Sequence, residues 1–474
     1  MSVETILLIV TLLAGFYMSW AIGANDVANA MGTSVGSGAL TLKQAVIIAA
    51  ILEFSGAFFF GSHVSSTIQK GIIDPSIFNG NPSILVYGML ASLLASATWL
   101  QLATYWGLPV STTHSIVGAV VGFGALVGGA HAVMWKNVAF IVSSWIISPL
   151  AGGIISFIIF SILRKKIFYH QKPLQEAKKL VPILPFALVI SMAIIFLFQE
   201  TKTSGISLSS EQKSLVSVGC AFFAAIAAYF LVKNVKHPKI LIKQKAPQSS
   251  DVLYSLSKAK KHLKKIEGTS VGEINYQISH MLNEIDTLND SLVQEEESSS
   301  IHTEYAAVEK IFGWMQILTA SLMAFAHGAN DVANAIGPLA AAFDIIKYGT
   351  INNYTTIPTW ALALGGGGIV VGLATWGWRV IMTIGKKITE LTPSRGFAAE
   401  FGAATTVLAA SKLGMPISTT HTLVGAVIGV GMAKGIGALN LGMTKYIFIS
   451  WIVTIPAGAA LAILYYNILL LSFG

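Results

Sequence analysis

Long apolar runs that contain almost no charge constrain this chain more than any other feature. Residues 138–163 and 180–198 are each longer than the roughly eighteen residues that cross the hydrocarbon core of a bilayer as a helix. Of all 474 residues, 54% are hydrophobic and only 11% are charged, so a water-soluble core could not bury this apolar surface. We therefore expect an all-α integral membrane protein.

Sequence blocks occur twice at a nearly constant offset. Gly-Ala-Asn-Asp-Val-Ala-Asn-Ala begins at Gly23 and again at Gly328, 305 residues later. Pro-Val-Ser-Thr-Thr-His begins at Pro109 and returns as Pro-Ile-Ser-Thr-Thr-His at Pro416, 307 residues later. A Ser-Trp pair followed by a proline is repeated as well. Three blocks in the same order indicate two homologous halves.

The distribution of Lys and Arg predicts how the chain is oriented. Residues 164–179, 233–245 and 379–395 contain six, five and four of them, whereas 62–83 and 199–213 contain one and two. Basic connections lie on the cytoplasmic side. The first half then enters its Asn-Asp block from outside and the second from the cytoplasm, which predicts two inverted-topology repeats with both termini outside. Much of the net charge of +8 is this topology signal, so nothing supports a nucleic-acid partner.

The chain divides into four parts by composition. We expect membrane repeat 1 in 1–163, connecting transmembrane segments in 164–232, a cytoplasmic helical loop in 233–308 and membrane repeat 2 in 309–474. The loop carries an apolar heptad pattern, which leaves a coiled coil and packing within the loop equally open. Its positions are Val271, Ile274, Ile278, Met281, Ile285, Leu288 and Leu292.

Each half contains two short apolar limbs around a Pro-containing polar turn. Proline ends the preceding helix, and the Ser/Thr residues that follow cap the next one. We expect limbs at 95–108 and 111–124, and at 401–413 and 418–431, forming two re-entrant helical hairpins. A helix N-terminus with hydroxyl donors forms an anion site that needs no Lys or Arg, and inverted halves would bring two such tips together. The predicted ligands are Ser111, Thr112, Thr113, Ser418, Thr419 and Thr420.

The duplicated Asn-Asp blocks place carboxylates inside apolar segments without a basic neighbour in sequence. An intramembrane Asp is costly unless it is paired or binds a cation. We expect the helices to break at these two blocks, and carboxylate and amide oxygens, with the carbonyls of broken helices, suit Na⁺. The predicted ligands are Asn25, Asp26, Asn29, Asn330, Asp331 and Asn334.

Further polar residues within apolar surroundings are candidates for coupling or gating. Glu53 and Glu400 are not symmetric copies: Glu400 aligns with Leu93, and Glu53 aligns with the glycine-rich tract near Gly365. His327 precedes the second Asn-Asp block, and three interpretations of it stay open: a gate, a substrate contact and a packing residue. A structural role is the favoured interpretation of the two histidines that end the Ser-Thr-Thr-His blocks, His114 and His421.

Signatures of enzymes are missing from the sequence. It has no Cys/His cluster, Walker loop or nucleophile elbow, so we expect neither ATP hydrolysis nor covalent catalysis, and no cofactor. The one cysteine, Cys220, excludes an intramolecular disulfide, and its place in an apolar run predicts a small core residue.

The two duplicated blocks resemble those of the inorganic phosphate transporter (PiT) family. The resemblance implies a symporter of inorganic phosphate with Na⁺ or H⁺, built from inverted repeats and dimeric. It also implies that Asp26, Asp331, Asn25 and Asn330 bind the cation and that the Ser-Thr-Thr tips hold phosphate. Glu53 and Glu400 resemble acidic positions that the family needs for transport.

We hypothesise an importer in the plasma membrane, the inner membrane in a Gram-negative cell, with Na⁺ as the coupling ion and H⁺ as the alternative. Sulfate or another oxyanion is a second substrate hypothesis, because helix dipoles and hydroxyls favour any tetrahedral anion. A receptor or scaffold that acts through residues 233–308 is the alternative from another class.

Overall fold

The computed structural model describes residues 2–197, 209–233, 235, 247–269, 272–351, 356–387, 391–435 and 441–474. Helices dominate this part of the chain, and its only β-pairing is an isolated bridge between Ile73 and Val133. The expected all-α architecture is confirmed.

The helices of the first half are α1 (Val3–Gly36), α2 (Leu42–Phe60), α3 (Ser62–Lys70), α4 (Pro82–Tyr105), α5 (Thr112–Val127) and α6 (Trp135–Leu163). The connecting helices are α7 (Pro173–Leu180), α8 (Ile183–Leu197), α9 (Ser210–Lys233) and α10 (Pro247–Glu267). The rest of the chain contains α11 (Glu273–Asp331), α12 (Ala333–Tyr348), α13 (Thr359–Thr375), α14 (Trp378–Lys387), α15 (Pro393–Lys412), α16 (Thr419–Lys434) and α17 (Leu441–Phe473).

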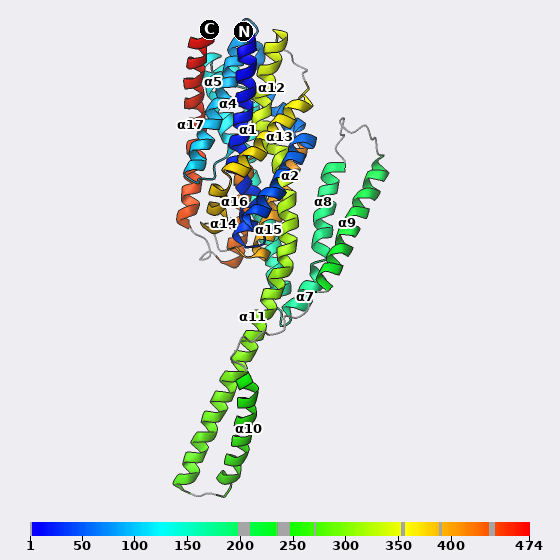
Figure 1. Cartoon of the computed structure of the whole chain (residues 1–474), viewed down its shortest axis with the longest axis vertical. Coiled ribbons are helices and arrows are strands. Elements are labelled where there is room, and N and C mark those ends of the chain that lie inside the picture. The colour runs from blue at the N-terminus through cyan, green and yellow to red at the C-terminus, as the bar shows by residue number, and fades with distance from the viewer. Residues whose placement is uncertain are drawn as a thin grey trace.

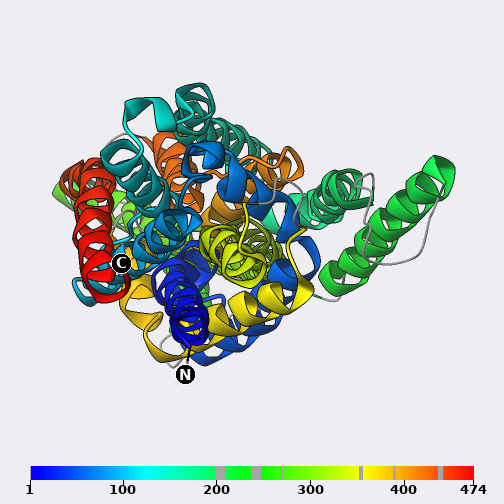
Figure 2. The ribbon, with the colours of Figure 1, turned by 90° about the horizontal axis from the view of Figure 1, so that it is seen from above.

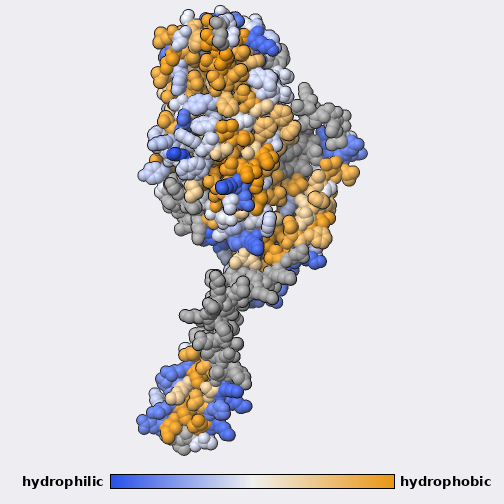
Figure 3. Space-filling view, in the orientation of Figure 1, coloured by the Kyte–Doolittle hydropathy of each residue, from blue (hydrophilic) through white to orange (hydrophobic). Residues whose placement is uncertain are grey.

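The helix bundle has the length and surface of a multi-pass membrane protein. Six helices in the described residues are long and apolar enough to cross a bilayer, or seven if the bent pair α13 and α14 counts as one span. Apolar side chains cover much of the sides of the bundle (Figure 3). In water this exposed apolar surface would be unfavourable, whereas hydrocarbon solvates it.

The two halves run in opposite directions and interlock. Both termini lie at one end of the bundle, from which α1 starts, whereas α11 enters from the other end (Figure 1). Helix α1 packs against α13, and α11 packs against α2; likewise α5 packs against α17 and α16 against α6. These are the equivalent contacts that two inverted repeats would make across their interface.

The hairpin limbs follow the predicted order but differ in length. Helices α5 and α16 are short, as expected, and begin after the serine caps Ser111 and Ser418. The preceding limbs begin at Pro82 and Pro393, earlier than the predicted 95 and 401. Residues 82–94 and 393–400, which precede the predicted starts, are the first turns of these helices.

The first Asn-Asp block lies within a continuous helix, so the prediction of a break there is wrong. Helix α1 runs unbroken through Gly23 and Asp26 to Gly36. The small residues allow another helix to approach instead of unwinding α1: a Cβ on Gly23 would lie only 2.0 Å from the Ile369 carbonyl oxygen. In the second half, α11 ends at Asp331 and α12 starts at Ala333, but Val332 between them keeps helical angles (φ −56°, ψ −27°) and the Ile336 N–H bonds to its carbonyl, so the helix is only locally irregular there.

The loop between the halves forms a helical hairpin that projects from the end of the bundle opposite the termini (Figure 1). Helix α10 packs against the start of α11, and Ile278 and Leu282 are buried between them. The heptad positions Ile274, Met281 and Leu288 are 50–61% exposed. Packing within the loop therefore accounts for part of the heptad pattern; Val271 and the side chain of Leu292 lie outside the described residues.

Helices α8 and α9 form a pair at the side of the bundle (Figures 1 and 2). Their Phe186 and Phe222 rings meet edge to face with centroids 5.1 Å apart. Cys220 is exposed on α9, so its prediction as a core residue is wrong. On a helix pair whose outer side faces hydrocarbon, an apolar residue has no need to be buried within protein.

Candidate functional site

The two hairpin tips meet at the centre of the bundle. The Thr113 hydroxyl donates to the Ile417 carbonyl oxygen at 2.8 Å, and the Thr420 hydroxyl donates to the Val110 carbonyl oxygen at 3.1 Å. Each tip therefore bonds to the turn of the other half. The six predicted tip residues from Ser111 to Thr113 and from Ser418 to Thr420 are all buried. The sequence prediction that the tips converge agrees with this geometry.

The start of each second limb presents unpaired backbone donors. The Ser111 hydroxyl accepts from the His114 N–H at 3.2 Å, and Ser418 caps His421 in the same way at 3.1 Å. The N–H groups of the first helical residues, Thr112 and Thr419, have no partner within their helices. Because two positive helix ends face one small volume, the arrangement favours an anion there.

One asparagine in each half bonds to the hairpin tip of the other half. Asn29 Nδ2 donates to Thr419 Oγ1 at 3.3 Å and to Thr420 Oγ1 at 2.9 Å. In the other half, Asn334 Nδ2 lies 3.3 Å from both Thr112 Oγ1 and Thr113 Oγ1. These reciprocal bonds couple the Asn-Asp blocks to the anion-type tips.

The first asparagine of each block holds a hairpin turn. Asn25 Nδ2 donates to Thr104 Oγ1 at 2.9 Å and to the Leu108 carbonyl, and its Oδ1 accepts from the Val110 N–H. Asn330 Nδ2 donates to Ser411 Oγ at 3.0 Å. Asn25 thus uses both side-chain groups on the turn, which leaves its predicted role as a cation ligand without support from this geometry. Thr104 and Ser411 were not predicted, although they occupy equivalent positions of the repeat.

Asp26 and Asp331 both approach one ring nitrogen of His327. His327 Nε2 lies 3.0 Å from Asp331 Oδ2 and 4.0 Å from Asp26 Oδ2. One ligand atom from each of the three buried residues falls within 4.8 Å of the others. Asp26 Oδ2 and Asp331 Oδ1 have no hydrogen-bond partner, nor has Asn334 Oδ1. These unpaired oxygens are the donor type that Na⁺ prefers.

His327 also contacts one of the two glutamates. Its Nδ1 lies 3.3 Å from Glu53 Oε2, and both side chains are fully buried. A Cβ on Gly328 would lie 2.1 Å from the Glu53 carbonyl oxygen, which matches the approach of Ile369 to Gly23. The counterpart of Glu53 is therefore Ile369, four residues beyond Gly365, and the predicted asymmetry of the two halves is present.

Glu400 lies in a separate cluster of hydroxyl and amide donors. Its carboxylate accepts from Ser34 Oγ at 2.6 Å, from Thr319 Oγ1 at 2.7 Å and from Gln316 Nε2 at 3.3 Å, and also from the Thr33 hydroxyl. The donors come from α1 and α11, and Glu400 lies on α15. The carboxylate thus ties the first limb of the second hairpin to both Asn-Asp helices. The sequence contained no signal for these donors, because Leu93 replaces Glu400 in the other half.

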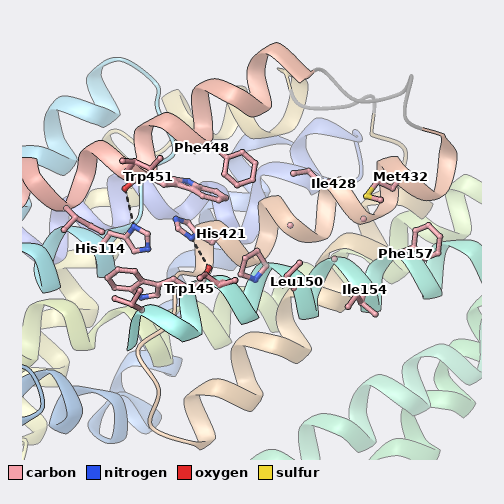
Figure 4. Close-up of a pocket in the computed structure, with 18 residues that line it drawn as sticks. His114, Trp145, Leu150, Ile154, Phe157, His421, Ile428, Met432, Phe448 and Trp451 are labelled. Atoms are coloured by element: carbon pink, nitrogen blue, oxygen red, sulfur yellow. Dashed lines mark hydrogen bonds between the residues drawn. The ribbon is translucent and has the colours of Figure 1, made fainter. Parts of the chain in front are cut away.

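His114 and His421 directly follow the tips and pack against Trp145 and Trp451. Their rings contact each other with centroids 4.2 Å apart (Figure 4). His114 Nδ1 bonds to the Trp451 carbonyl and His421 Nδ1 to the Trp145 carbonyl, both at 3.4 Å. This crossed packing between halves agrees with the structural role predicted for the two histidines. They form one end of an apolar cavity of about 760 Å³ between α6, α16 and α17.

Comparisons with known proteins give a consistent result. Residues 22–462 match the sequence profile described as the phosphate transporter family. The chain is 48% identical to the chloroplastic inorganic phosphate transporter 2-1 of Arabidopsis thaliana, over 96% of this chain and 71% of that protein. It is 43% identical to a putative phosphate permease of Pyrococcus horikoshii, over 98% of both chains. A solved structure titled the sodium-dependent phosphate transporter superposes with a TM-score of 0.79 at 38% identity, covering 98% of this chain and 99% of that one.

Proposed function

The chain belongs to the phosphate transporter family, and from that premise we propose that it is a secondary symporter that imports inorganic phosphate with Na⁺ by alternating access. The observation that carries the proposal is the charge of the central cluster. Asp26, Asp331 and Glu53 surround one imidazole, and among the described residues no Lys or Arg is buried. Phosphate would add further negative charge a few ångströms away, so mobile cations have to enter with it.

The hairpin tips would bind phosphate through their helix N-termini. The unpaired N–H groups at Thr112 and Thr419 and the hydroxyls of Ser111 and Ser418 are donors that a tetrahedral anion can accept from. Phosphate enters only after the direct tip-to-tip bonds of Thr113 and Thr420 break. Each such bond contributes only about 1 kcal/mol net, so anion binding can offset their loss.

Na⁺ would bind to the unpaired oxygens beside the tips. Asp26 and Asp331 supply carboxylates, and Asn334 supplies an amide oxygen. Asn29 and Asn334 bond to the tips as well, so cation binding and tip closure act on the same side chains. The solved relative that superposes on this chain is titled sodium-dependent, which supports Na⁺ as the coupling ion.

A second candidate is coupling to H⁺, and it rests on His327. A protonated imidazole would donate to Asp331 on one side and Glu53 on the other, at 3.0 and 3.3 Å. The histidine would then supply the positive charge that Na⁺ supplies in the first proposal.

The test is uptake of radiolabelled phosphate by the purified protein in proteoliposomes. We expect a Na⁺ gradient at constant pH to drive uptake, and Asp26→Asn or Asp331→Asn to abolish this dependence. Undiminished Na⁺-driven uptake in both variants would show that the carboxylates are not coupling ligands. Uptake driven only by a pH gradient would favour the second candidate, and a tenfold excess of sulfate that blocks uptake would point to a general oxyanion carrier.

We also place the protein in the plasma membrane, with the hairpin of α10 and α11 in the cytoplasm, and infer a homodimer. The strongly basic connections at the hairpin end support this orientation. Labelling of single-cysteine variants in intact cells, on a Cys220→Ser background, tests the orientation: Met281→Cys should react only after the cells are opened.

A further inference from the structure

Three lysines line a cavity of about 600 Å³ where the α8 and α9 pair meets α7. Lys178 and Lys179 come from the end of α7, and Lys233 ends α9. Pro182 and Tyr229 complete the lining. The cavity lies outside the central cluster and takes no part in the proposed cycle.

The positive charge of the cavity is only partly balanced. Lys179 pairs with Glu176 at 2.6 Å, and this hydrogen bond holds the pKa of the Glu176 carboxyl below its usual value, so Glu176 is ionised. Lys178 donates to the Val235 carbonyl, and Lys233 lies 5.7 Å from the centre of the Tyr229 ring. Neither Lys178 nor Lys233 has a carboxylate partner among the described residues. Two positive charges therefore stay unbalanced at one small site.

The cavity lies where an apolar span ends. Residues Glu211–Lys233 form one of the candidate membrane spans, and Lys233 is its last residue. The α9 side chains that lead to the cavity, Phe222, Phe223, Ile226 and Phe230, are each more than half exposed. A charged site at the end of such a surface is at the depth of lipid headgroups.

We propose that this cavity binds the phosphate headgroup of an anionic phospholipid, whose acyl chains lie along the exposed apolar face of α9. The unbalanced lysines match a phosphodiester, and the adjoining apolar face matches the acyl chains. Free inorganic phosphate shares the headgroup chemistry, but it would leave the apolar face unused. The proposal does not depend on which cation drives transport.

The experiment is native mass spectrometry of the full-length protein with added phosphatidylglycerol or phosphatidylcholine. The test variant is Lys178→Gln/Lys233→Gln. The matched control is Lys136→Gln/Lys213→Gln. It removes the same charge near the N-terminal ends of α6 and α9, whereas the cavity lies at the C-terminal end of α9. We expect the wild type and the control to retain phosphatidylglycerol in preference to phosphatidylcholine.

For the test variant we expect phosphatidylglycerol to bind roughly 30-fold more weakly, which corresponds to about 1 kcal/mol for each lysine. Equal retention by the test variant and the control would overturn the proposal. Displacement of the lipid by millimolar inorganic phosphate would also overturn it, in favour of a free phosphate site. A test variant that still takes up phosphate is folded, so its loss of lipid could not be attributed to misfolding.

Discussion

Replacing the same threonine in each half should have unequal consequences, because only Thr419 makes a short hydrogen bond to the carboxylate beside it. Each threonine accepts from an asparagine of the other half at 3.3 Å, Thr112 from Asn334 and Thr419 from Asn29. Thr419 Oγ1 also donates to the Asp331 carboxylate at 2.7 Å, whereas the equivalent contact of Thr112 with Asp26 is weaker. Asn334 keeps a second acceptor in Thr113. A hydrogen bond to a charged group contributes about 1.5–3 kcal/mol, and one between neutral groups about 0.5–1.5 kcal/mol.

We therefore expect Thr419→Val to destabilise the Na⁺-free protein about twice as much as Thr112→Val. Valine has nearly the same shape as threonine, so the comparison isolates the hydroxyl group. The assay is thermal unfolding of the detergent-solubilised protein without Na⁺ and phosphate. Adding Na⁺ should raise the midpoint temperature of Thr419→Val more than that of Thr112→Val, because a bound cation can replace the lost donor at Asp331.

The control for this comparison is Thr422→Val, one turn further along α16. Its hydroxyl donates to the Ser418 carbonyl, which also accepts from the Thr422 N–H, so the variant leaves no acceptor unpaired. Its midpoint should change little. If Thr112→Val is as damaging as Thr419→Val, or if Na⁺ stabilises both equally, the assignment of different electrostatic roles to the two tips is wrong.

The remaining contacts of the site lead to three more predictions. His327→Gln should abolish any uptake driven by a pH gradient while Na⁺-driven uptake persists, as measured in proteoliposomes; persistence of the pH-driven part would exclude this imidazole as the proton carrier. Glu400→Gln should lower the free energy of unfolding by about 2–4 kcal/mol, because four donors lose a charged acceptor; an unchanged thermal midpoint would contradict this. Gly328→Ala should prevent folding, since its Cβ would lie 2.1 Å from the Glu53 carbonyl oxygen, whereas Gly367→Ala, which has no atom within 4 Å of its Cβ, should be tolerated; size-exclusion profiles of the two variants compare them directly.

Most of the predictions about the site came from the duplication of the sequence blocks. Because the Asn-Asp and Ser-Thr-Thr-His blocks each occur twice, their residues can be paired across the halves by counting along the chain alone. The same offset also relates Thr104 to Ser411, whose hydroxyl oxygens accept from Asn25 and Asn330 at the hairpin turns and which inspection of the blocks alone missed. Repeat symmetry is thus informative even for single polar residues outside an obvious motif.

Asymmetric contacts could not be predicted in this way. Glu400 has Leu93 as its counterpart, and Glu53 has Ile369, so the repeat gives no information about their partners. The donors around Glu400 come from positions in α1 and α11 that have no distinctive spacing. The break expected at Asp26 also failed, because a run of small residues can either unwind a helix or allow close packing, and only the neighbouring helix α13 decides between them.

The sequence by itself determined the membrane class, the two homologous halves and the two kinds of polar block. These properties depend on the composition and order of residues along the chain, because transfer into hydrocarbon and helix capping are local effects. Only the tertiary structure decided that His327 lies between Asp331 and Glu53, that Asn25 holds a turn, and that the tips of the two hairpins bond to each other. Those contacts join residues that lie far apart in the chain, and their geometry depends on how closely the helices that carry them can pack.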